Sequence, residues 1–171
     1  LLGSHDTKRI QLKLNYDQVR VKLVSLFLFV YPGAPCIYYG DEIGLDGGKD
    51  PDCRRAFPWD ESKWDHSLRE WFKKLIQIRK DRVSLRRGDY QQIAVSKDGY
   101  AFCRCQGDEH TFVVINFSDL ETHLHLPCDI ITLDDVHSMT DLLTGEKHEY
   151  NEEIAMTIPP LSARILAINE S

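Results

Sequence analysis

The spacing of hydrophobic residues changes once along this 171-residue chain, close to Gly88. Before that point, apolar residues recur at the intervals of amphipathic helices, with one short apolar segment between them. Beyond it, short segments alternate apolar and polar residues and are separated by turns that contain glycine. We therefore expect two domains, residues 1–86 of the α/β class and residues 87–171 of the all-β class.

Two helices and one strand are predicted in the first domain. Residues 17–31 are predicted to form a helix that ends before Pro32, with an apolar face made of Val19, Leu23, Leu26, Phe27 and Val30. Cys36–Tyr39 is predicted to be a short buried strand. The next helix has Ser67 and Glu70 at capping-box spacing and an apolar stripe made of Leu68, Trp71, Phe72, Leu75 and Ile78. This succession of helix, strand, long loop and helix is typical of a βα barrel.

The second domain is predicted to be an antiparallel β-sandwich. Six segments alternate strongly enough to be predicted as strands, namely residues 91–96, 100–105, 111–117, 122–126, 154–158 and 163–168. Glycine lies beside polar residues in the turns, as in Lys97–Gly99 and Thr144–Glu146. About eight strands in roughly 85 residues is the density of a sandwich.

Composition narrows the possible partners. The chain has 21 Lys and Arg residues against 27 Asp and Glu residues, a net charge of −6, which disfavours nucleic acid and anionic membranes. The longest apolar run, residues 23–31, is far shorter than the roughly 20 residues of a membrane-spanning helix. The cysteines at positions 36, 53, 103, 105 and 128 lack the paired spacing of a metal site. We expect reduced thiols, no metal or other cofactor, and a cytoplasmic protein.

Two segments of the first domain carry recognisable motifs. Leu1–Arg9 reads Leu-Leu-Gly-Ser-His-Asp-Thr-Lys-Arg, and Gly33–Glu42 reads Gly-Ala-Pro-Cys-Ile-Tyr-Tyr-Gly-Asp-Glu. Together they resemble the last two strand ends of the catalytic barrel of α-amylase-type glycoside hydrolases. The loop Gly47–Arg55 is most similar to the cyclomaltodextrinase, neopullulanase and maltogenic amylase group. The resemblance implies that residues 1–86 are the last βα units of a TIM (β/α)8 barrel and that residues 87–171 are the C-terminal β-sandwich domain.

The resemblance gives His5 and Asp6 roles in catalysis. His5 would hydrogen-bond the bound sugar, and Asp6 would stabilise the transition state. Glycosidic cleavage passes through an oxocarbenium-like species, whose developing positive charge a fixed carboxylate stabilises. Taken alone, the same dipeptide is better explained as a surface carboxylate beside a hydrogen-bonded histidine. The pair Asp41–Glu42 is interpreted as architecture, because adjacent side chains on a strand point in opposite directions.

Asp50 and Arg54 are the predicted substrate-binding residues. In the resembled group, an Asp and an Arg four positions later bind a glucose unit on the non-reducing side of the cleaved bond. A carboxylate accepts hydrogen bonds from sugar hydroxyls, and a guanidinium donates several in a fixed fork. A solvated loop with an internal Asp–Arg pair and a calcium loop built from Asp46, Asp50 and Asp52 remain alternatives. Trp59 suits sugar stacking and core packing equally.

The resemblance implies a parent enzyme that hydrolyses α-1,4-glucosidic bonds of cyclodextrins, pullulan or maltooligosaccharides with retention. The family carries its aspartate nucleophile and its glutamate acid/base on earlier barrel strands, outside the motifs found in this chain. We therefore expect the chain by itself to be inactive. α-Glucan oligosaccharides are the expected ligands, and a transglycosylase or an α-glucosidase of the same family is a milder alternative.

Two further expectations concern association and binding. Helix 17–31 carries more apolar surface than one neighbour would cover, so it should contact the missing N-terminal barrel portion or a second copy of the chain. A hypothesis from another class is a non-catalytic module that binds glucans through the sandwich. Its candidate aromatic residues are Tyr90, Tyr100 and Phe102.

Overall fold

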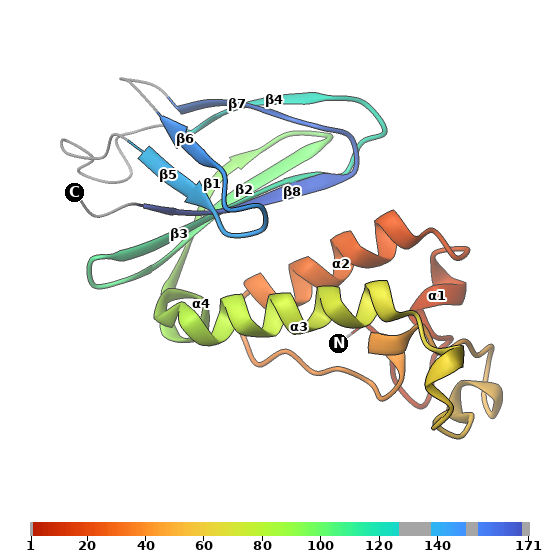
Figure 1. The fold of residues 1–171 in the computed structure, drawn as a ribbon. Coiled ribbons are helices and arrows are strands. Elements are labelled where there is room, and N and C mark those ends of the chain that lie inside the picture. Colours follow the sequence, from red (N-terminus) through yellow and green to blue (C-terminus); the bar gives the residue numbers. More distant parts are fainter. Residues whose placement is uncertain (1, 127–137, 150–153, 169–171) are drawn as a thin grey trace. The chain divides into compact units, whose positions relative to one another are not determined.

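The computed structural model describes residues 2–126, 138–149 and 154–168 (Figure 1). The chain divides into two compact units, residues 1–79 and residues 80–171, and each is described by itself. The first unit is helical, and the second consists mainly of β-strands.

The first unit contains α1, α2 and most of α3, together with three short 3-10 helices. Their bounds are α1 Ile10–Lys13, α2 Gln18–Val30, η1 Asp41–Ile43, η2 Asp52–Arg54, η3 Glu61–Lys63 and α3 His66–Asp81. The long helices α2 and α3 supply most of the buried side chains of this unit. The predicted site residues lie in the loop before α1 and in the segment between α2 and α3.

α2 begins and ends where the sequence predicts a helix. The Asp17 carboxylate accepts a hydrogen bond from a backbone N–H of the first turn at 3.0 Å, and the helix ends just before Pro32. The buried face differs from the predicted one, since Val19 is 53% exposed. The buried side chains are Val21, Leu23, Ser25, Leu26, Phe29 and Val30. The cause is the position of α3, because Phe72 packs edge-on against Phe29 with ring centroids 5.8 Å apart.

α3 is capped by Asp65, so the predicted capping box of Ser67 and Glu70 is wrong. The Asp65 carboxylate accepts a hydrogen bond from the Leu68 backbone N–H at 2.9 Å. Ser67 lies inside the first turn, and its hydroxyl accepts a hydrogen bond from Lys22. Aspartate and serine are comparable caps, so spacing alone did not separate them. The buried stripe contains the predicted Leu68, Phe72, Leu75 and Ile78, while Trp71 is only partly buried.

No strand forms at residues 36–39, where the sequence predicted a buried one. The segment is irregular, and both Cys36 and Tyr39 are exposed. A strand depends on hydrogen bonds to a neighbouring strand, and no described segment pairs with these residues. Residues 2–4, which precede His5, form no strand for the same reason. Both motifs therefore lie on loops whose backbone has no sheet partner among the described residues.

The second unit contains α4 and eight strands in its described residues. The bounds are α4 Val83–Arg87, β1 Asp89–Val95, β2 Gly99–Gln106, β3 Glu109–Asn116, β4 Thr122–Leu126, β5 Ser138–Asp141, β6 Lys147–Glu149, β7 Ile154–Ile158 and β8 Ser162–Ile168. All the strand pairs are antiparallel. The six strands predicted from the sequence are present. β5 and β6 were not predicted, because three or four residues are too few to show a period of two.

The strands form two sheets (Figure 1). These sheets share one hydrophobic core. The larger sheet has the order β1-β2-β3-β8-β5-β6, and the smaller sheet pairs β4 with β7. Both sheets contribute side chains to the core, which contains Ala101, Cys103, Phe112, Val114, Leu124, Met139, Met156, Ile158 and Leu166. Two antiparallel sheets packed on a common core make up the sandwich that the alternating pattern predicts.

Four cysteines lie in the described residues, and all four are free thiols. Cys103 and Cys105 are neighbours on one face of β2, with their sulfur atoms 3.2 Å apart. Burial raises the pKa of the Cys103 thiol above its ordinary value. Cys128 lies outside the described residues. None of the described helices is both long enough and apolar enough to cross a membrane.

Candidate functional site

The four site residues predicted from the sequence lie together, and Arg54 connects them. Its Nε atom is 2.8 Å from the Asp50 carboxylate and 3.0 Å from the carbonyl oxygen of His5. Its Nη2 atom is 3.5 Å from the Asp6 carboxylate. The other Asp6 oxygen lies 3.1 Å from Nε2 of the His5 ring. The fold thus joins residues up to 49 positions apart into one cluster.

The cluster is open to solvent. The side chains of His5, Asp6, Asp50 and Arg54 are 65%, 68%, 54% and 49% exposed. Ion pairs this exposed contribute at most about 1 kcal/mol each to stability. A ligand can therefore replace these contacts at small cost. Two carboxylates and a guanidinium together accept and donate enough hydrogen bonds to hold a hydroxyl-rich molecule.

The alternative of an internal ion pair is partly realised, since Asp50 and Arg54 do pair with each other. A purely local pair would not involve the distant turn at His5 and Asp6. Arg54 nevertheless contacts both residues of that turn. The loop pair is therefore part of a larger arrangement that includes the first motif.

The calcium alternative is not supported, because each of its three carboxylates already forms an ion pair with an arginine. Asp46 accepts a hydrogen bond from the Tyr16 hydroxyl at 2.9 Å, and Asp52 pairs with Arg55 at 2.7 Å. A backbone N–H and the Arg55 guanidinium hold the pKa of Asp52 below its ordinary value. Asp50 pairs with Arg54, as described above. The described part of the chain contains no group of three or more His, Cys, Asp or Glu that could hold a metal ion.

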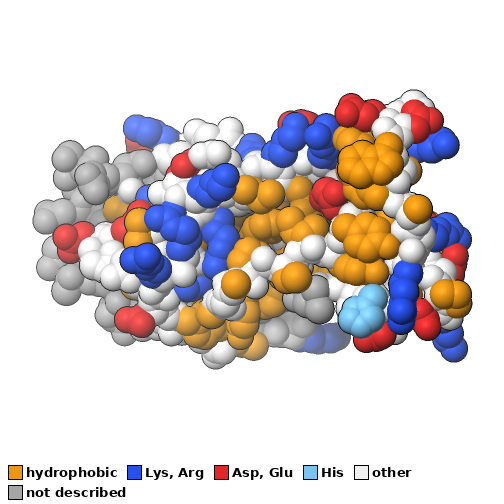
Figure 2. All heavy atoms as spheres, turned by 90° about the horizontal axis from the view of Figure 1, so that it is seen from below, with side chains coloured by type: hydrophobic (Ala, Val, Ile, Leu, Met, Phe, Trp, Pro, Cys, Tyr) orange, Lys and Arg blue, Asp and Glu red, His pale blue; other side chains and the backbone are white. Residues whose placement is uncertain are grey.

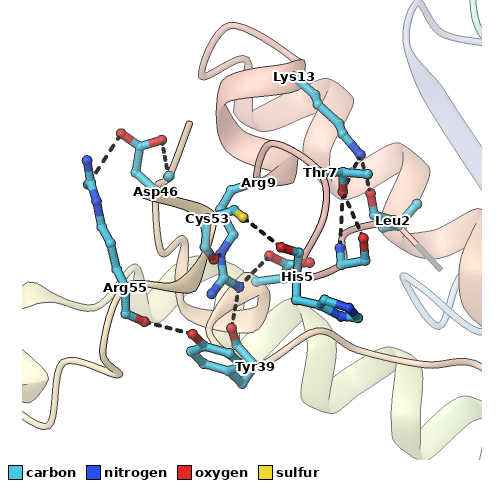
Figure 3. A network of polar contacts seen from close by, with 12 residues as sticks. Leu2, His5, Thr7, Arg9, Lys13, Tyr39, Asp46, Cys53 and Arg55 are labelled. Atoms are coloured by element: carbon cyan, nitrogen blue, oxygen red, sulfur yellow. Dashed lines mark hydrogen bonds and ion pairs between the residues drawn. The ribbon is translucent and has the colours of Figure 1, made fainter. Parts of the chain in front are cut away.

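A fully buried arginine, which the sequence analysis did not single out, joins the segments that carry the cluster. Arg9 donates from Nε to the Cys53 carbonyl oxygen at 2.9 Å and from Nη1 to the Tyr39 carbonyl oxygen. The same Nη1 atom is 3.3 Å from the Asp41 carboxylate. The guanidinium also lies over the Tyr38 ring, 4.0 Å from its centroid. Figure 3 shows Arg9 between Tyr39 and Cys53, with His5 on the other side of the Cys53 thiol.

The sequence held one signal for this arginine. Asp41 was interpreted as architecture, and a buried carboxylate needs a cationic or hydrogen-bonding partner. Arg9 ends the first motif, so the two motifs could have been paired through these two charges. The two motifs approach closely at Gly3, because a Cβ atom at this position would lie 2.7 Å from Asp41 Oδ2. Any side chain at position 3 would therefore force the Asp41 carboxylate to move.

The Asp41 carboxyl group is strongly affected by its burial. Its side chain is 2% exposed, and this burial raises its pKa to about 6, against the opposing effect of the Arg9 guanidinium. Asp41 Oδ2 and Arg9 Nη2 are buried and have no hydrogen-bond partner among the described residues. The pair is therefore desolvated without being fully satisfied, and its net contribution to stability is small.

The aromatic residues proposed for a sandwich binding face are not exposed. Phe102 is fully buried, and Tyr90 and Tyr100 are partly buried with their hydroxyl groups hydrogen-bonded to each other. Trp59 of the first unit is 83% exposed and packs against Phe57, with ring centroids 4.9 Å apart. Trp59 therefore does not belong to the core.

Models of two protein families match the chain. The alpha amylase catalytic domain matches residues 1–83, and the alpha amylase C-terminal all-beta domain matches residues 90–169. A cyclomaltodextrinase from Geobacillus thermopakistaniensis is 37% identical over 171 residues, covering 98% of this chain and 28% of that protein. Neopullulanase 2 from Thermoactinomyces vulgaris is 36% identical over 169 residues, covering 97% of this chain and 28% of that protein. An α-amylase from Geobacillus thermoleovorans, crystallised with acarbose, superposes with a TM-score of 0.87 at 28% identity, covering 99% of this chain and 38% of that chain.

The chain therefore belongs to the α-amylase family of glycoside hydrolases. Within the family it is similar to the cyclomaltodextrinase and neopullulanase group. It spans about 28% of the length of the two curated relatives named above. The predicted fold class is confirmed as a helical portion of the catalytic domain, residues 1–83, followed by an antiparallel all-β C-terminal domain.

We expect the stability of the first unit to depend on pH through Asp41. Its pKa of about 6 lies above the ordinary value of 3.8, so the folded state binds the proton more tightly than the unfolded state does. The free energy of unfolding should therefore fall as the pH rises from about 4 to about 7, by up to about 3 kcal/mol. Urea unfolding followed by tryptophan fluorescence measures it, because Trp59, Trp64 and Trp71 all lie in the first unit.

The Asp41→Asn variant is the control for this measurement. All other carboxyl groups titrate in both proteins, so their effects cancel in the difference between the two free energies of unfolding. As the pH rises, the parent chain should lose stability relative to the Asp41→Asn variant. A difference that stays constant across this pH range would contradict the argument.

Proposed function

We propose that the protein containing this chain is a retaining glycoside hydrolase that cleaves α-1,4-glucosidic bonds in cyclodextrins, pullulan or maltooligosaccharides. The observation that carries the proposal is the convergence of His5, Asp6, Asp50 and Arg54 in one solvent-open cluster. Similarity to a cyclomaltodextrinase and a neopullulanase supports the substrate class. The acarbose complex of a related α-amylase supports an α-glucan ligand.

The proposed roles follow from the chemistry of the four side chains. The Asp6 carboxylate stabilises the positive charge that develops on the sugar, and His5 hydrogen-bonds a substrate hydroxyl. Asp50 accepts hydrogen bonds from a glucose unit on the non-reducing side, and Arg54 donates to the same unit. Transglycosylation and α-glucosidase activity would use the same residues, and the products formed by the full-length protein decide between them.

Binding of maltotriose tests the proposed site directly. We expect Asp50→Ala to weaken maltotriose binding by about tenfold or more, because a lost hydrogen bond to a charged group costs roughly 1.5–3 kcal/mol. Tyr100→Ala, in the β domain, should bind as the parent chain does. Titration calorimetry of the three proteins measures the affinities. Loss of binding in the Tyr100 variant alone would instead favour the non-catalytic module.

The purified 171-residue chain should not hydrolyse pullulan or β-cyclodextrin. A retaining mechanism needs a nucleophile and an acid/base whose carboxyl groups lie about 5–5.5 Å apart across the scissile bond. We assign neither role to a residue of this chain. The measurement is maltose or panose release, with Asp6→Asn as an isosteric control for contaminating activity. Release by the parent chain that disappears in the Asp6 variant would contradict the proposal.

Association through α2 is a further part of the proposal, either with a copy of the chain or with the N-terminal barrel portion. Hydrophobic side chains reach the surface among charged ones (Figure 2). On and beside α2, Val19 is 53% and Tyr31 is 39% exposed. Covering such apolar area contributes about 25 cal/mol per Å².

Sedimentation velocity tests this part of the proposal. The isolated chain should self-associate as its concentration rises, and Val19→Lys should weaken that association. Val95→Lys is the matched control, because Val95 is 60% exposed but lies on β1. A chain that stays monomeric at every concentration would contradict self-association and leave the N-terminal barrel portion as the proposed partner of α2.

A further inference from the structure

The Arg9 guanidinium connects three separate segments of the first unit. Its hydrogen bonds and its ion pair go to Cys53, Tyr39 and Asp41, and its backbone N–H donates to the Gly47 carbonyl oxygen at 2.9 Å. Arg9 itself is the last residue of the first motif. Its side chain and its backbone N–H together therefore connect the first motif, the end of the second motif and both ends of the loop at residues 47–53.

Cys53 links Arg9 to the exposed cluster of His5, Asp6, Asp50 and Arg54. Its carbonyl oxygen accepts the hydrogen bond from Arg9, and its thiol donates to the His5 carbonyl oxygen at 3.0 Å. Cys53 is fully buried, and the next residue is Arg54. The Nε atom of Arg54 donates to the same His5 oxygen at 3.0 Å. The position of Arg54 relative to Asp6 is therefore set through Cys53, which Arg9 holds.

We propose that Arg9 and Asp41 are positioning residues for the glucan site, which hold the loop of Asp50 and Arg54 against the turn of His5 and Asp6. The pair does not reach the solvent-exposed cluster, so it does not touch the sugar. The sugar-binding part of this inference rests on the proposed function. The positioning part rests on the contacts of Arg9 alone.

The buried Arg9–Asp41 ion pair is better suited to positioning the loops than to stabilising the fold. A buried ion pair contributes little net stability, and replacing both partners with apolar residues of similar size is often neutral or stabilising. Arg9 Nη2 and Asp41 Oδ2 are moreover unsatisfied among the described residues. An arginine fork does, however, fix the direction of each acceptor, which an apolar side chain does not.

The double variant Arg9→Met/Asp41→Leu separates the two roles. Methionine suits the space beside the Tyr38 and Tyr39 rings, and leucine has nearly the shape of aspartate. We expect the variant to stay folded, although it should unfold at a lower urea concentration than the parent chain, because the Cys53 and Tyr39 carbonyl oxygens lose their donor. Its affinity for maltotriose should nevertheless fall about tenfold or more, since small displacements of binding groups are costly. Its Arg54 Nε–H signal in the NMR spectrum should shift and exchange faster with solvent.

Arg79→Met is the matched control. Arg79 is another buried arginine of the first unit, and it donates to the carbonyl oxygens of Phe29 and Gly33 instead of the loop. This variant should lose stability while the Arg54 signal and the maltotriose affinity stay as in the parent chain.

Several results would overturn the inference. One is a folded double variant with the parent affinity and the parent Arg54 signal. Another is a loss of affinity that follows the loss of stability equally in both variants. If the double variant does not fold, Arg9→Lys, which keeps the charge but not the fork, is measured instead, and an unchanged Arg54 signal contradicts the proposal. Absence of maltotriose binding by the parent chain would contradict the proposed function. The Arg54 signal would still test whether Arg9 and Asp41 position the loop of Arg54.

Discussion

A guanidinium group that is removed from water needs acceptors in several directions, and Arg9 finds three of them in two other segments of the chain. The Cys53 and Tyr39 carbonyl groups and the Asp41 carboxylate surround it. None of these segments belongs to a long helix, and no described strand holds them. Backbone without sheet or helix partners is otherwise free to rearrange. The buried arginine therefore supplies order where regular secondary structure does not.

The exposed cluster depends on this arrangement although it takes little stability from its own contacts. The ion pairs that join Arg54 to Asp50 and Asp6 are open to water and individually weak. Their weakness suits a binding site, because a sugar can replace them without a large penalty. Their placement cannot come from the pairs themselves. It comes from the buried residues one position away, above all Cys53 with its bonds to Arg9 and His5.

Local signals in the sequence predicted most of the fold, and non-local contacts account for what they missed. Asp17 before an apolar run and Pro32 after it were enough to bound α2. The strand at residues 36–39 failed because a strand needs a partner that no described segment provides. In the site, Asp50 and Arg54 were predicted from the resemblance to the family, whose sugar-binding Asp and Arg have the same four-residue spacing. Arg9 was missed because two of its partners are backbone carbonyl groups, which every residue has and which no sequence pattern distinguishes. Only its third partner, the Asp41 carboxylate, can be recognised from the residue type.

We propose that two loops held by one buried arginine form a single glucan site. The most direct measurement is a crystal structure of the protein with bound acarbose. We expect a sugar ring hydrogen-bonded to both Asp50 and Arg54, beside Asp6, with the Arg9 contacts to Cys53 intact. Acarbose bound only on the β domain, or Asp50 and Arg54 far from Asp6 with the sugar in place, would contradict it.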